Sequence, residues 1–292
     1  MDRKDFIKKG LMGTGMFITS AALGDALKND IDEIAPLEPI GFNHLPNEKS
    51  LVLENTVLHR AGSRGHANHG WLDSHHTFSF ANYHNPDRMH FGVLRVLNDD
   101  RVDPGMGFGT HPHDNMEIIS IPLEGDLEHK DSMGNTAVIR KGDIQVMSAG
   151  TGIYHSEYNK NKDKLTKFLQ IWVYPNKRNV TPRYDQITLD EAARRNKLQQ
   201  ILSPNADDEG VWIHQDAWFH MGTFDKGVSS EYALKRKGNG IYAFVLKGDF
   251  TIGGIALNER DGLGVWDTSD ITITANSQDA SILLMDVPMA LR

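Results

Sequence analysis

From Leu51 onward, Gly, Asn, Asp and Pro divide the chain into short apolar runs. The runs hold roughly four to eight residues and are rich in β-branched and aromatic side chains. Runs of this length are short for helices and suit strands that are buried on at least one face. The pattern therefore predicts an all-β sandwich or barrel. Examples are FGVLRVL (91–97), MEIISIPL (116–123) and KFLQIWVY (167–174).

Two distant stretches share one arrangement of strands and turns. Residues 116–143 and 241–265 each read as a strand, a Gly-Asp turn, a strand, a second Gly or Asn turn, and a strand. This similarity predicts two copies of one β domain. A linker at 184–203 is expected to join them, with one helix over LDEAARRNKLQQIL (189–202). The apolar residues of that segment lie roughly on one helical face, and Ser-Pro-Asn follows it.

The first 26 residues have the layout of an export leader. Arg3, Lys4, Lys8 and Lys9 precede an uncharged run over 10–23, which is too short to span a membrane. DRKDFIK (2–8) resembles the twin-arginine motif, with a lysine in place of the second arginine. We expect a periplasmic or exported protein, and the alternative is an amphipathic N-terminal helix on a cytoplasmic protein.

The domain order expected from these patterns has five parts. They are a leader (1–26), a linker (27–50), a first β domain (51–183), the linker helix region (184–203) and a second β domain (204–292).

Charge and cysteine content narrow the classes of function. The net charge is −8, so the chain lacks the excess of basic residues with which nucleic-acid binders contact phosphates. The chain has no cysteine, which excludes disulfides, thiol nucleophiles and cysteine-ligated metals. With 14 histidines, any metal site would use imidazole and carboxylate ligands.

Two His-containing stretches have the spacing of metal ligands. His111 and His113 stand two positions apart, as do His155 and Glu157, so each pair projects from one face of a strand. If the two strands pair, three imidazoles and one carboxylate converge. Such a set suits Fe(II), Mn, Ni, Cu or Zn better than Ca or Mg. Glu117 is an alternative carboxylate, because it would share a face with His113 on a continuous strand.

Both stretches resemble the motifs of a known superfamily. Residues 105–125 resemble the first cupin motif, G-x5-H-x-H-x3-E-x6-G, with one extra residue before the last glycine. Residues 142–159 are similar to the second motif, P-x-G-x2-H-x3-N, with Gly150 in place of its proline. Roughly residues 51–290 resemble the pirin family, and specifically its bacterial quercetinase-like members. The motifs that carry this resemblance are HTFSFANYHNP, GTHPHDNMEI, EGDLEHKDSMGN, KGDIQVMSAGTGIYHSE and FLQIWVYP.

The pirin resemblance implies a fold and a ligand set. The fold would be all-β, with two tandem cupin barrels (double-stranded β-helix jelly rolls) joined by the short helical linker. The metal would lie only in the first barrel, bound by His111, His113, His155 and Glu157. Glu117 is not a ligand in this family. Fe(II) is the expected metal, with Mn, Ni, Cu or Zn as alternatives.

The same resemblance implies a function. Quercetinase-like pirins are associated with oxidative ring cleavage of flavonols, so a flavonol-like molecule and dioxygen would be the substrates. Glu157 is the candidate base. The alternatives are a metal- or redox-sensing pirin that binds a regulatory protein partner, and a cupin that stores or senses a small ligand. We expect a monomer with no membrane span. Apolar residues could line the pocket or simply pack in the core; they are Phe78, Phe80, Met106, Phe108, Met147 and Ile153.

Overall fold

The computed structural model describes residues 55–291. The leader and linker predicted at 1–26 and 27–50 lie outside the described residues. Within 55–291 the elements are strands and three 3-10 turns, η1 (Ala61–Ser63), η2 (Pro86–Arg88) and η3 (Ala192–Arg194), with no α-helix. This part of the chain accordingly contains no helix that is long and apolar enough to cross a bilayer. The all-β prediction is confirmed.

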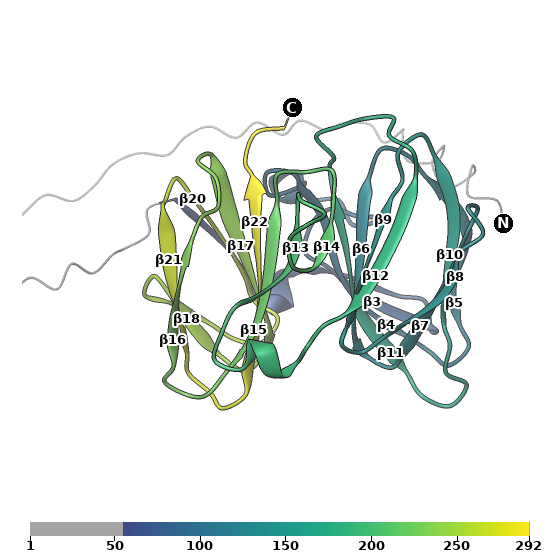
Figure 1. The fold of residues 1–292 in the computed structure, drawn as a ribbon. Coiled ribbons are helices and arrows are strands. Elements are labelled where there is room, and N and C mark those ends of the chain that lie inside the picture. Colours follow the sequence, from purple (N-terminus) through teal and green to yellow (C-terminus); the bar gives the residue numbers. More distant parts are fainter. Residues whose placement is uncertain (1–54, 292) are drawn as a thin grey trace, which may run out of the picture. The chain divides into compact units, whose positions relative to one another are not determined.

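The first barrel consists of two antiparallel sheets whose inner faces pack together (Figure 1). The larger sheet has the order β12 (Arg183–Thr188), β9 (Asp143–Ser148), β6 (Glu117–Glu124), β11 (Thr166–Val173), β4 (Leu94–Val102), β3 (Leu72–His76) and β2 (Gly65–Asn68). The smaller sheet has the order β5 (Gly107–His113), β10 (Ile153–Asn159), β7 (Asp126–Asp131) and β8 (Thr136–Arg140).

The second barrel repeats this plan. Its larger sheet has the order β1 (Thr56–His59), β20 (Gly262–Trp266), β17 (Asn239–Lys247), β22 (Ala280–Pro288), β15 (Trp218–Phe224), β13 (Gln199–Ser203) and β14 (Val211–Trp212). Its smaller sheet has the order β16 (Ser229–Ala233), β21 (Asp270–Ala275), β18 (Phe250–Ile252) and β19 (Ile255–Leu257). Strands β4–β11 thus recur as β15–β22 in the same spatial order, which confirms the predicted internal repeat.

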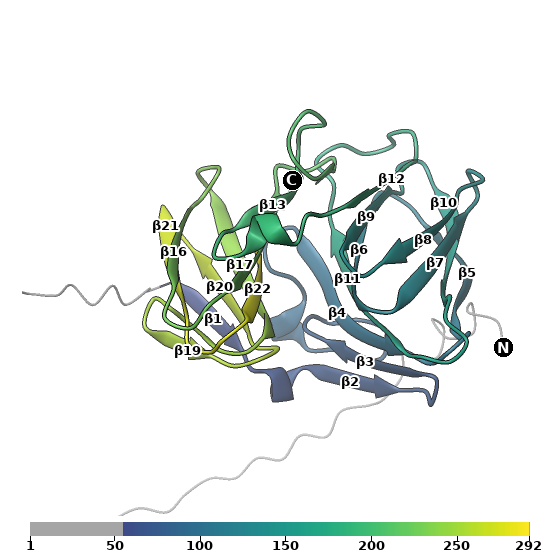
Figure 2. The ribbon, with the colours of Figure 1, turned by 60° about the horizontal axis from the view of Figure 1, so that its bottom comes forward.

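One strand from the start of the described chain belongs to the second barrel. At the edge where the first barrel has β12, the second barrel has β1, which comes from the start of the described chain and pairs with β20. Figure 2 shows β1, drawn in dark purple, among the green and yellow strands of the second barrel. The range 51–183 therefore contains one strand that completes the other barrel.

The predicted linker helix is wrong. Residues 183–188 form β12, 192–194 form a single 3-10 turn, and 199–203 form β13, which pairs with β14 and β15. Ile201 and Leu202 are adjacent and both fully buried in the core between the barrels. The β13–β15 ladder has a register shift between Gln200 and Leu202, and this irregularity lets both adjacent side chains reach one core. Sheet pairing and this burial override the helical pattern.

The main core lies between the two larger sheets. β6 contributes Ile119 and Ile121 from the first barrel, and β15 contributes Phe219 from the second. The alternate residues of β6 face the inside of the first barrel, where Ile118 packs with Met147. The large sheet is therefore buried on both faces, and its inner face is held rigidly for a site inside the barrel.

Candidate metal centre

The strands that carry the candidate ligands are direct neighbours. β5 and β10 pair antiparallel, with His155 opposite His111 and Ile153 opposite His113. The pairing that the sequence pattern required is therefore present. The register then shifts, so that Glu157 lies opposite Phe108 and β5 carries one extra residue. This bulge keeps cross-strand partners on a common face, which is the inner face because His155 and Glu157 are buried.

The three imidazoles converge on one point. Nε2 of His111 and Nε2 of His155 are 3.0 Å apart. The ring centroids lie 4.4 Å apart for His111 and His155, and 4.9 Å apart for His113 and either of the other rings. One nitrogen from each of these three histidines can be chosen so that all lie within 4.8 Å of one another.

The donor atoms fit a transition metal ion. Nδ1 of His111 lies 2.8 Å from the carbonyl oxygen of Gly109. A carbonyl only accepts, so Nδ1 carries the proton and donates, and the lone pair of Nε2 is directed toward His155. Two nitrogens that are each about 2.1 Å from one ion, at a right angle, are about 3.0 Å apart. The observed separation of the two Nε2 atoms matches this value.

His155 is held in the form that binds metals. Burial, together with the nearby His111 and His129, lowers the pKa of His155 to about 3. Its imidazole is therefore neutral near pH 7, as a metal ligand must be. Nδ1 of His155 is buried and has no hydrogen-bond partner among the described residues. Packing against the ring of His129, 5.3 Å away, orients this imidazole instead.

Glu157 is buried two positions after His155 on β10, and residues across the barrel hold it. Its carboxylate accepts hydrogen bonds from Nε2 of Gln170, at 3.0 Å and 2.8 Å to its two oxygens, and from Oγ of Ser120 at 3.1 Å. Gln170 and Ser120 lie opposite each other on β11 and β6 of the larger sheet. The carboxylate does not belong to the set of atoms that lie within 4.8 Å of one another.

Comparisons with known proteins identify the family of the chain. Residues 57–173 match the Pirin family, and residues 200–287 match the quercetinase C-terminal cupin domain. A protein of Escherichia coli K12 named quercetin 2,3-dioxygenase is 46% identical over 231 residues, which are 79% of this chain and 98% of the relative. The chain belongs to the pirin family.

Further members and a solved structure extend the comparison. A pirin-like protein of Caulobacter vibrioides is 40% identical over 223 residues, which are 76% of this chain and 95% of that protein. The crystal structure of the bacterial pirin YhhW of E. coli in complex with nickel(II) has a TM-score of 0.76 and 45% identity. It covers 80% of this chain and 99% of the YhhW chain. The two-cupin architecture of the pirins is therefore the fold of this chain.

Glu117, the alternative carboxylate, lies outside the histidine cluster. A turn over 114–116 ends β5 and starts β6, and Asn115 in it has a φ of 42°. His113 and Glu117 therefore do not lie on one continuous strand. The prediction that Glu117 shares a strand face with His113 is wrong. Glu117 is buried and accepts a hydrogen bond from Oγ of Ser148 at 2.6 Å.

Several of the apolar residues that were expected to line a pocket lie elsewhere. Phe78 belongs to the core between the barrels, and Met106 is an exposed surface residue. Phe108 packs against the cluster of Leu72, Val102, Leu127, Ile139 and Phe168. Met147 and Ile153 pack with Trp172, whose ring lies 4.9 Å from that of His113 and 5.4 Å from that of Phe80. Trp172 thus packs directly against one histidine of the cluster.

Sequence reasoning missed Trp172, Gln170 and Ser120. All three lie in apolar runs, FLQIWV and EIISIP, that were used only to predict strands. The available signal was the polar residue within each run. A glutamine or serine at an inward-facing position of a buried strand needs a hydrogen-bond partner, and the buried carboxylate of Glu157 is that partner.

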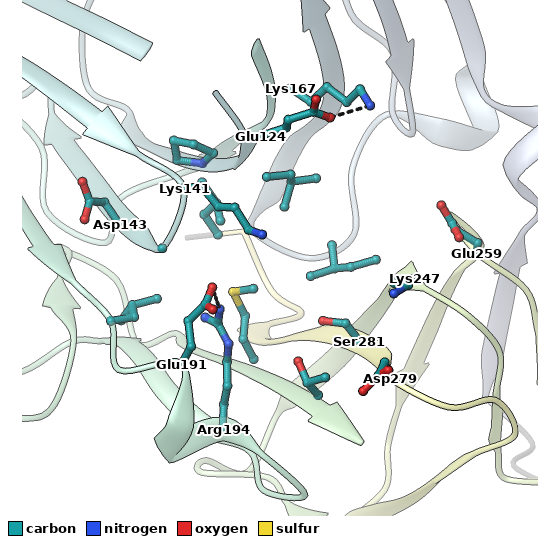
Figure 3. A pocket seen from close by; sticks show the side chains of 18 of the residues that line it. Glu124, Lys141, Asp143, Lys167, Glu191, Arg194, Lys247, Glu259, Asp279 and Ser281 are labelled. Atoms are coloured by element: carbon teal, nitrogen blue, oxygen red, sulfur yellow. Dashed lines mark hydrogen bonds and ion pairs between the residues drawn. The ribbon is translucent and has the colours of Figure 1, made fainter. Parts of the chain in front are cut away.

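A cleft lies between the two barrels, and its lining differs from the histidine cluster. This cleft of about 590 Å³ is lined by residues of both barrels and of the connecting segment, with no histidine among them. Figure 3 shows Lys141 extending into it, beside the ion pairs of Glu124 with Lys167 and of Glu191 with Arg194. Most of its cations are thus matched by carboxylates, and it lacks a nitrogen-rich ligand set. The histidine cluster is the better candidate site.

Proposed function

We propose that this chain is a metal-dependent dioxygenase of the quercetinase type, which cleaves a ring of a flavonol or a similar enolic aromatic compound. One observation carries the proposal: three imidazoles converge inside the first barrel, and the buried, hydrogen-bonded carboxylate of Glu157 follows one of them on the same strand face. The 46% identity to the E. coli quercetin 2,3-dioxygenase supports the substrate class. The overall reaction consumes the flavonol and dioxygen and releases carbon monoxide and the ring-opened ester.

His111, His113 and His155 would hold a divalent first-row transition metal, with Glu157 as a fourth ligand. Nitrogen-rich sites with one carboxylate favour Fe, Mn, Ni, Cu or Zn. When bound, the metal would act as a Lewis acid toward the substrate oxygen and as an electron conduit to dioxygen. Our sequence expectation is Fe(II), and the E. coli structure was determined with nickel(II), so both belong in the first test.

Glu157 would take the proton of the substrate hydroxyl. Gln170 and Ser120 orient its carboxylate, and together they leave part of its acceptor capacity for a third partner. A carboxylate fixed in this way can remove a proton from a hydroxyl group within hydrogen-bond reach. The rings of Trp172 and Phe80 would form an apolar wall that binds an aromatic substrate and excludes water.

The test is oxygen uptake by metal-free protein reconstituted anaerobically with Fe(II), Mn(II), Ni(II) or Cu(II) in turn. With quercetin, we expect saturable uptake, carbon monoxide release and loss of at least about 100-fold in rate for His113→Ala. His90→Ala changes an exposed histidine outside the cluster and is the matched control. If every metal binds and none supports turnover, the dioxygenase proposal is wrong. A regulatory, metal-sensing function is then the alternative to test.

We also propose export of the folded protein, based on the leader-like residues 1–26. A twin-arginine route carries folded chains, which suits a protein that receives its metal in the cytoplasm. Fusion of residues 1–50 to a reporter should place the reporter in the periplasm, and a cytoplasmic reporter would contradict export.

A further inference from the structure

A second cluster of metal-binding side chains lies on the β2–β3 hairpin. Asp73 and His75 stand two positions apart on one face of β3, and His66 lies opposite His75 on β2. β2 is the edge strand of the larger sheet, so the cluster faces solvent. The side chains of His66, Asp73 and His75 are 51%, 33% and 37% exposed.

Two imidazole nitrogens face one carboxylate oxygen. Nε2 of His66 is 2.7 Å from Oδ1 of Asp73, and Nδ1 of His75 is 3.8 Å from the same oxygen. One ligand atom from each of the three residues lies within 4.8 Å of the others. Around an ion with bonds of about 2.0–2.2 Å, neighbouring ligand atoms are about 3.0–3.5 Å apart. The two observed distances lie on either side of that range, so small side-chain rotations would complete the site.

The imidazole rings are already packed together. The rings of His66 and His75 are stacked, with centroids 4.5 Å apart and planes 18° apart. Cross-strand pairing fixes the positions of their β-carbons, so the two rings are held near each other without a ligand. Little side-chain entropy would then be lost when an ion binds.

The charges nearby permit a cation to bind. The carboxylate of Asp73 supplies a negative charge within the cluster, and Arg64 is a nearby charge that would oppose a bound cation. Arg64 is itself paired with Asp99 at 3.2 Å, so its charge is balanced. Asp99 lies opposite His75 on β4 and also pairs with Arg260 at 3.2 Å, so its charge is taken up by two arginines and Asp73 is the anionic group of the cluster.

We propose that His66, Asp73 and His75 form a second site for a divalent transition metal ion, separate from the histidine cluster inside the barrel. Two imidazole nitrogens and one carboxylate oxygen suit Zn(II), Ni(II) or Cu(II) and disfavour Ca(II) or Mg(II). Because three protein ligands leave coordination positions open, water or a ligand atom from another molecule would complete the shell. The site does not depend on the proposed dioxygenase function.

The test is metal stoichiometry in the full-length chain. Metal-free protein is equilibrated with Ni(II), and in a second series with Zn(II), dialysed, and analysed for bound metal per chain. We expect two ions in the unaltered chain, one in His66→Ala and one in His75→Ala. His113→Ala should also retain one ion, and the double variant His66→Ala/His113→Ala should retain none. The control His90→Ala should keep two.

Asp73→Asn gives a milder second variant, because it keeps the size of the side chain and removes its charge. Circular dichroism establishes that each variant is folded. The inference is overturned if the unaltered chain binds one ion, or if the second ion persists in His66→Ala, Asp73→Asn and His75→Ala. Loss of the ion in His113→Ala without turnover in any protein would count against the dioxygenase proposal alone, so the two failures are distinguishable.

Discussion

At the scale of single residues, Glu117 illustrates how burial changes a carboxyl group. Burial raises the pKa of Glu117 to about 7, against the opposing effects of the Ser148 hydrogen bond and the charge of Arg183. The native protein therefore retains a proton at this side chain over a pH range in which the unfolded chain has released it. The cost of ionising the native carboxyl reduces the free energy of unfolding as the pH rises from about 4.5 to about 7.

Glu117→Gln removes this pH dependence. The free energy of unfolding of the variant, relative to the unaltered chain, should rise by up to about 3 kcal/mol between pH 4.5 and 7.5 and stay constant above that. Urea denaturation across this range measures it, with Glu259→Gln at an exposed position as the control. A difference that does not vary with pH would contradict the prediction. Metal binding should be unchanged in both variants.

The residue-level pattern predicted part of the site. An i, i+2 spacing is visible in the sequence and fixes a shared strand face. It therefore predicted that His111 projects with His113, and that His155 projects with Glu157. Gln170 and Ser120 contact Glu157 only because β11 and β6 lie across the barrel from β10. Contacts between facing sheets depend on the closure of the barrel, which no local pattern contains.

At the scale of elements, strand pairing decides conformations that local patterns leave open. The predicted helix over 189–202 fails because residues 199–203 gain a ladder with β15 and bury adjacent apolar residues. β1 is a second case. It is a short strand whose partner β20 lies in the other repeat, so its sequence alone assigns it to the wrong barrel.

β1 should contribute strongly to stability. Val57 and Leu58 pack against the two cores, and Nδ1 of His59 lies 2.8 Å from the hydroxyl of Tyr242. A chain that lacks residues 1–59 should lose at least about 3 kcal/mol in free energy of unfolding, because these contacts disappear and the edge of β20 becomes unpaired.

The matched control is a chain that begins at Asn55 and so retains β1. Chemical denaturation of both truncated chains provides the comparison. Equal stability of the two chains would show that the pairing of β1 with β20 contributes nothing to the free energy of unfolding.

At the scale of the whole described chain, the two barrels share one core. Side chains from both larger sheets belong to a single buried cluster, which includes Leu169 of the first barrel and Phe244 of the second. Neither large sheet can bury its outer face without the other. The two barrels should therefore unfold in one cooperative transition although each has a separate interior.

Phe219→Ala tests this coupling. Phe219 is fully buried on β15 of the second barrel, and its truncation should cost about 3–5 kcal/mol. Native-state hydrogen exchange should then show equal losses of protection in β17 of the second barrel and β6 of the first. Tyr154→Ala, at a position that is 57% exposed, is the control. Loss confined to the second barrel would mean that the barrels unfold independently.

The position of β1 in the second barrel also links folding to protein synthesis. His59 and Tyr242 are separated by 183 positions, so the first of these segments leaves the ribosome long before its partner exists. Closing a loop of that length costs about 5 kcal/mol of chain entropy, which later contacts must offset. The first barrel can complete its own sheets during translation, whereas the second barrel can do so only after the ribosome has delivered nearly the whole chain. Nascent chains that terminate early would present an unpaired β1, which is a feature that chaperones and proteases can recognise.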